Sequence, residues 1–184
     1  SGETMIEYHV LFVGLLVGTE AFFTVLAVAN VRYGERTVRE ERDWVEDTLG
    51  VDDVEAINDY HRATTGFSLL QSWVSLGVLL LVLYSGLFRE AVLAVESLGF
   101  GPVVEGVVFL LGGIAVAQVL SWPFDAVNTF VVEEIFEFNE QSPGLWLRDK
   151  LLGLAILGVL GGVLVGVLLV LVETFPTLWW VAFW

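Results

Sequence analysis

With 56% hydrophobic residues in a chain of 184 and a mean hydropathy of +0.77, this sequence is too apolar for a water-soluble domain with a modest core. Its net charge of −15 argues against binding to nucleic acid or to an anionic lipid surface. The absence of cysteine excludes disulfides, thiolate metal sites and thiol nucleophiles.

Four stretches are apolar over the roughly 18 or more residues that a helix needs to cross the hydrocarbon layer of a bilayer. These predicted spans cover residues 6–31, 67–88, 103–122 and 151–172, and a fifth begins at about residue 176. The expected fold is therefore all-α, a multi-pass transmembrane helical bundle. We expect residues 1–184 to form a single membrane domain.

The connections between the spans also carry signals. The charged segment after the first span favours helix, so we expect it to extend the first two spans. Gly50 is expected to end one helix there, and Asp52 or Asp53 to cap the next. The short segment 89–102 contains GFGP, which indicates a turn.

The basic residues predict how the chain is oriented in the membrane. Seven of the eight lie in segments 32–65 and 124–150, and only Arg89 lies on the other side. The positive-inside rule then places both segments in the cytoplasm and the N-terminus outside. Excess acid, with arginine preferred to lysine, indicates a salt-rich cytoplasm and hence a prokaryotic, haloarchaeal-like cell membrane. Stability that does not rise with salt would contradict this origin.

Polar residues inside the spans are costly when they face lipid, so their placement is informative. The polar residues of spans two and three recur at helical spacing in the cytoplasmic half of each helix, and Glu20 lies within span one. They either line a water-filled chamber or form hydrogen bonds between helices without one, and both alternatives stay open. The candidate chamber-lining residues are Glu20, Gln71, Ser75, Gln118 and Asp125.

Glycines recur every fourth residue in two spans, as in helices that pack closely in lipid. In span four they are Gly158, Gly162 and Gly166, and in span one they are Gly14 and Gly18. We expect tight helix contacts along both stripes.

No catalytic or metal-binding pattern occurs in the sequence. The two histidines, His9 and His61, are predicted on opposite sides of the membrane and cannot share a zinc ion. There is no H-E-x-x-H motif, no G-x-S-x-G motif and no glycine-rich phosphate loop. We therefore predict no catalytic residue, metal ligand or cofactor within this chain.

The stretch FDAVNTFVVEEIFEFNEQSPG, residues 124–144, interleaves carboxylates and amides with aromatic residues. Pro123 is expected to kink or restart the helix before it, and SPG is expected to end it. The segment is either an amphipathic helix at the membrane interface or a helix packed against protein. An interfacial helix on anionic lipid has a basic polar face. Because this polar face is acidic, packing against protein is favoured.

The block LSWPFDAVNTFVVEEIFEFNEQSPGLWLRDKL resembles the signature of the Ste24-type CAAX prenyl proteases, which are integral-membrane zinc metallopeptidases of the M48 class. The resemblance covers nearly the whole chain, but only about residues 119–152 are specific to the family. It departs from the family pattern at Glu137, where the family has glycine, and at Ile135, where it often has a basic residue. The matching residues are Pro123, Asn128, Thr129, Phe130, Glu133, Glu134, Phe138 and Asn139, followed by Asp149.

The resemblance implies that the chain is the N-terminal membrane domain of such a metalloendopeptidase, catalytically incomplete alone. In the family, the zinc-binding H-E-x-x-H helix lies downstream, and zinc-assisted hydrolysis takes place at a chamber within the membrane. The implied partners are the lipid bilayer, the downstream catalytic part of the same polypeptide, and a peptide or membrane-protein substrate that can be prenylated. Candidates for the rim of the active site are Asn128, Thr129, Phe130, Glu133, Glu134, Phe138 and Asn139.

Two other functions stay open at this point. One is a non-catalytic membrane scaffold or adaptor that binds a partner through its acidic cytoplasmic face. The other is half of a transporter, for which the ionisable Glu20 inside span one is the best argument.

Overall fold

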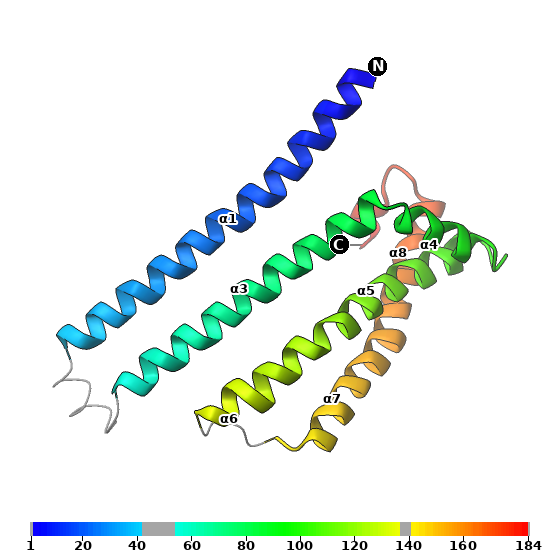
Figure 1. The fold of residues 1–184 in the computed structure, drawn as a ribbon. Coiled ribbons are helices and arrows are strands. Elements are labelled where there is room, and N and C mark those ends of the chain that lie inside the picture. The colour runs from blue at the N-terminus through cyan, green and yellow to red at the C-terminus, as the bar shows by residue number, and fades with distance from the viewer. Residues whose placement is uncertain (1, 42–53, 137–140, 184) are drawn as a thin grey trace. The chain divides into compact units, whose positions relative to one another are not determined.

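The computed structural model describes residues 2–41, 54–136 and 141–183, and within them the chain forms helices and no strand (Figure 1). Four helical stretches of these residues are long and apolar enough to cross a membrane, which confirms the predicted fold class. They are Ile6–Glu40, Asn58–Tyr84, Pro102–Ile135 and Pro143–Thr174. None of the residues in their apolar windows is buried within the chain, as suits side chains that face lipid or neighbouring helices.

Two of these stretches contain a π-helical turn, a local widening in which each N–H bonds five residues back. The elements are α1 (Gly2–Glu40), α3 (Val54–Tyr84), α4 (Leu87–Glu96), α5 (Pro102–Val127), η1 (Asn128–Val132), α6 (Glu133–Ile135), α7 (Pro143–Ile156), η2 (Leu157–Gly161), α8 (Gly162–Thr174) and α9 (Trp179–Phe183). The π-helical turns are η1 and η2.

The second helix begins before the predicted span 67–88 and ends earlier than it, because α3 runs from Val54 to Tyr84. Gly86 has φ of +91°, a left-handed conformation that glycine adopts without steric cost, and α4 begins after it. The GFGP sequence forms the predicted turn, with Gly99 at φ +67° and Gly101 at φ +92°. The Gly101 amide donates to the Glu105 carboxylate (3.1 Å), which satisfies one of the free amides at the start of α5.

The helix does not restart at Pro123, because α5 continues through it to Val127. Proline has no amide hydrogen to donate within the helix, and the π-helical turn η1 follows from Asn128. The predicted break at SPG is confirmed. Ser142 accepts a hydrogen bond from the Leu145 amide (3.3 Å) as the N-cap of α7, with Pro143 in the first turn. Gly50, Asp52 and Asp53, the predicted caps of the first connection, lie outside the described residues.

The chain divides into two compact units. One comprises residues 1–81 with 124–139, and the other comprises 82–123 with 140–184.

In the first unit, α1 and α3 run antiparallel, side by side (Figure 1), and two polar links join them. The Trp73 indole donates to the Thr24 hydroxyl (3.0 Å), and the Arg62 guanidinium donates to both carboxylate oxygens of Glu35 (3.0 and 3.1 Å). The links are eleven residues apart on each helix (35 − 24 and 73 − 62). Eleven residues are about three helical turns, so both links lie on one face of each helix and fix a single register.

Aromatic contacts join α3 to the segment after Pro123 in the same unit. The rings of Tyr60 and Phe136 are 5.2 Å apart in an edge-to-face arrangement, and those of Phe67 and Phe124 are 6.0 Å apart. Pairs of this geometry contribute about 0.5–1.5 kcal/mol beyond the area that they bury. The predicted packing of this acidic segment against protein is therefore observed at Phe124 and Phe136.

In the second unit, side chains of α5 and of the fourth span fill the space beside each other's glycines. A Cβ added at Gly161 would stand 3.1 Å from Leu111, and one added at Gly106 would stand 2.7 Å from Leu169. Gly162 and Gly166 also face α5, at 3.6 Å from Leu111 and 3.8 Å from Val107. The glycine stripe of span four is therefore a packing surface, but Gly14, Gly18 and Gly158 have no side chain or other helix within 4 Å.

Candidate functional site

The residues predicted for the active-site rim begin in the π-helical turn η1. The Asn128 side-chain amide donates to the Glu133 carboxylate (3.0 Å), and the Glu133 backbone amide donates to the Asn128 carbonyl. In a regular α-helix, residues five apart are rotated by about 140° around the axis and their side chains do not meet. The i-to-i+5 bonding of the π turn stacks these two residues, so the turn itself creates the pair.

The other rim candidates differ in how exposed their side chains are. Thr129 and Phe130 are half-buried, as are Asn128 and Glu133, whereas Glu134 is exposed. Phe138 and Asn139 lie outside the described residues, as does Glu137, the position that departs from the family pattern. The described rim candidates thus include a polar pair, Asn128 and Glu133, with the exposed carboxylate of Glu134 beside it.

The chamber-lining candidates differ in their surroundings. Glu20 lines a groove between α1 and α3, and the other four do not line it. Gln71 and Asp125 are half-buried, while Ser75 and Gln118 are exposed. Helical spacing thus identified three partly buried side chains, Glu20, Gln71 and Asp125, and a chamber shared by all five candidates stays a prediction.

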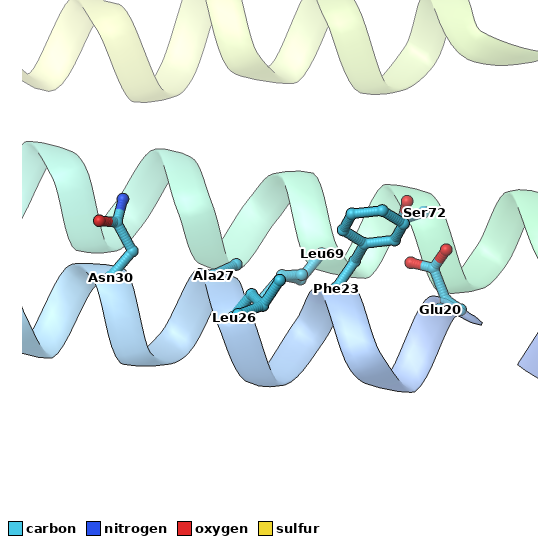
Figure 2. A pocket seen from close by; sticks show the side chains of 7 residues that line it. All are labelled: Glu20, Phe23, Leu26, Ala27, Asn30, Leu69 and Ser72. Atoms are coloured by element: carbon cyan, nitrogen blue, oxygen red, sulfur yellow. The ribbon is translucent and has the colours of Figure 1, made fainter. Parts of the chain in front are cut away.

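The groove beside Glu20 is shallow and open on one side, with a volume of about 570 Å³. Its walls are mostly apolar, and its polar side chains are Glu20, Ser72 and Asn30. Figure 2 shows Glu20, Phe23 and Ser72 toward one end and Asn30 at the other, with Leu26, Ala27 and Leu69 between them.

The sequence alone did not identify Thr24 and Trp73 as interacting residues. Their hydrogen bond joins α1 to α3 beside this groove. Thr24 also donates to the Glu20 carbonyl (2.8 Å), so the Trp73 indole is tied to the same helical turn as Glu20. The two interhelical links are eleven residues apart on both helices. This spacing could have predicted that Thr24 meets Trp73 only if the register of the two helices were already known.

The described residues do not fit a metal site. Among residues 2–41, 54–136 and 141–183, no three histidine, cysteine, aspartate or glutamate side chains are grouped so that they could hold a metal ion.

Residues 36–184 match the family model described as the CAAX prenyl protease N-terminal region, with five membrane helices. That match covers far more than half of the chain. The chain belongs to this family. The Ste24-type resemblance seen in the N-T-F and E-E residues is thereby confirmed, and so is an integral multi-pass membrane protein.

Two relatives with similar sequences carry the same family name. The CAAX prenyl protease 1 of Saccharomyces cerevisiae is 26% identical over 74% of this chain. The probable CAAX prenyl protease 1 of Schizosaccharomyces pombe is 30% identical over 63% of it. The chain spans only 33% and 27% of the lengths of these two relatives.

Proposed function

We propose that this chain is the N-terminal membrane domain of a Ste24-type metalloendopeptidase that cleaves peptides or membrane proteins, including prenylated ones. The observation that carries the proposal is the family match over residues 36–184, together with relatives that are named CAAX prenyl proteases. The domain would supply part of the wall of an intramembrane chamber. It would not supply the metal ligands, because the described residues offer no group that fits one.

Within this proposal, the segment around Asn128 and Glu133 forms the rim of the chamber and positions substrate. Its support is local: the π turn aligns an amide and a carboxylate that are half-buried beside exposed Glu134. π-Helical turns inside α-helices are frequent at functional sites, because they place side chains where a regular helix does not. We assign these residues a positioning role.

The test is cleavage of a farnesylated CAAX-ended peptide by the natural gene product that carries this chain, purified in a neutral detergent. We expect cleavage that a zinc chelator abolishes and added zinc restores, with zinc measured in the purified protein. The same peptide without its prenyl group reports whether the lipid is required. A gene product that contains no zinc and cleaves neither peptide would overturn the proposal.

The cytoplasmic placement of segments 32–65 and 124–150 belongs to the same proposal. It puts the rim on the side from which cytoplasmic substrates would enter, and the distribution of basic residues supports it.

A further inference from the structure

Glu20 is a carboxylic acid inside a membrane-spanning helix that has no basic neighbour. No lysine or arginine occurs in residues 6–31 or 67–88. Arg62, which lies toward the start of α3, is committed to Glu35. Within the described part of the chain, no side chain forms a hydrogen bond or ion pair with the Glu20 carboxylate, and the Thr24 hydroxyl bonds only the Glu20 backbone carbonyl. A charge in this position costs about 2.5–3.5 kcal/mol and is usually paired or functional.

Glu20 lies at one end of the groove, whose length and lining indicate the kind of ligand that would fit. The lining residues on α1 extend from Glu20 to Asn30, ten residues or about 15 Å of helix. Between those two polar ends lie apolar side chains from both helices: Leu26, Ala27 and Leu69. A ligand that matches these walls therefore has one charged end and a long apolar body.

The chemistry at the Glu20 end selects the sign of that charge. The carboxylate attracts a cation, and the Phe23 ring lies at the same end of the groove (Figure 2). The face of an aromatic ring attracts ammonium groups, most strongly when they are shielded from water. Gly77, which the register of the helix pair places opposite Glu20, has open space where a Cβ would stand. Gly77 itself therefore leaves no side chain opposite Glu20.

We propose that the groove between α1 and α3 binds a single-chain alkylammonium amphiphile, with its amine or quaternary ammonium headgroup at Glu20 and its alkyl chain along Leu26 and Leu69. The proposal does not rest on the protease function. Five of the seven lining residues precede residue 36, where the family match begins.

The test uses the natural gene product in maltoside micelles and dodecyltrimethylammonium as the probe, with bound probe counted by native mass spectrometry. We expect saturable binding that Glu20→Gln weakens about tenfold or more, because a charged partner is lost. Glu173→Gln, an exposed carboxylate on α8, is the matched control and should bind as the unchanged protein does.

Two further arms keep the test decisive. Ala27→Phe fills the middle of the groove and leaves Glu20 in place, so this variant should also abolish binding of the probe. The helical content of each variant, measured by circular dichroism, shows that the variant is folded. Dodecanol, which has the same chain without the charge, should bind at least tenfold more weakly than the ammonium probe. Equal binding of dodecanol, or unchanged binding by Glu20→Gln or Ala27→Phe, would overturn the proposal.

Discussion

Asn128 and Glu133 are bonded twice, once through the backbone and once through their side chains. A hydrogen bond to a charged group is stronger than one between neutral groups, so the pair stabilises the π turn that creates it. The turn and the side-chain pair are therefore mutually dependent. The substitution that best tests the pair removes the donor and leaves the shape of the side chain unchanged.

We predict that Asn128→Asp lowers stability by about 1–2 kcal/mol, because it replaces the donor with a second carboxylate beside Glu133. Glu133→Gln should be mild, since its side-chain oxygen still accepts from Asn128. The double variant Asn128→Asp/Glu133→Gln should recover most of the loss, because the glutamine amide can donate to the new aspartate. Thermal unfolding in detergent measures all three.

The same series tests the positioning role in the parent enzyme. Asn128→Asp should reduce turnover of the prenylated peptide severalfold without loss of zinc, and the double variant should restore it. Zinc loss in the single variant would contradict a positioning role, and so would a double variant as impaired as Asn128→Asp.

At the scale of helices, the glycines of the fourth span do not act as the uniform stripe that their spacing predicts. Gly162 and Gly166 face α5, but the nearest approach is at Gly161, and Gly158 contacts nothing. The π turn Leu157–Gly161 explains the difference. It inserts an extra residue into the helical repeat, so residues before it are rotated relative to those after it.

We predict that Gly161→Leu destabilises the packing of α5 against the fourth span by about 1–3 kcal/mol, the usual cost of overfilling a close contact. Gly158→Leu introduces the same side chain one turn earlier, in open space, and should change stability little. The difference between their thermal midpoints measures the contact. Equal effects of the two substitutions would mean that Leu111 does not pack against Gly161 in the membrane.

At the scale of the whole molecule, the described residues include four helices that are apolar enough to span a membrane, and the few basic residues predict the orientation of these helices. Because the chain has no cysteine, single cysteines can be introduced and labelled without background. Exposed Glu41 follows α1, and exposed Leu98 lies between α4 and α5.

We predict that Leu98→Cys reacts with a membrane-impermeant maleimide in intact cells, whereas Glu41→Cys reacts only after the cells are permeabilised. This result would follow from the positive-inside rule, since the basic residues cluster on the Glu41 side. The reverse labelling pattern would invert the orientation and place the rim segment outside the cell.

The sequence by itself determined the properties that depend on neighbours along the chain. Long apolar runs predicted the membrane helices, SPG predicted the start of α7, and the order of N-T-F and E-E pointed to the family. Each of these signals is local, because crossing a bilayer, ending a helix or matching a signature requires only residues close in sequence.

Only the tertiary structure decided which side chains meet. The pairing of Thr24 with Trp73 depends on the register of two antiparallel helices, and no single-helix periodicity contains that register. The meeting of Asn128 with Glu133 depends on a π turn, a departure from the regular repeat on which every periodicity argument rests. For Glu20, the sequence identified an ionisable group within the membrane, and the packing of α1 beside α3 provided the groove in which it can bind a ligand.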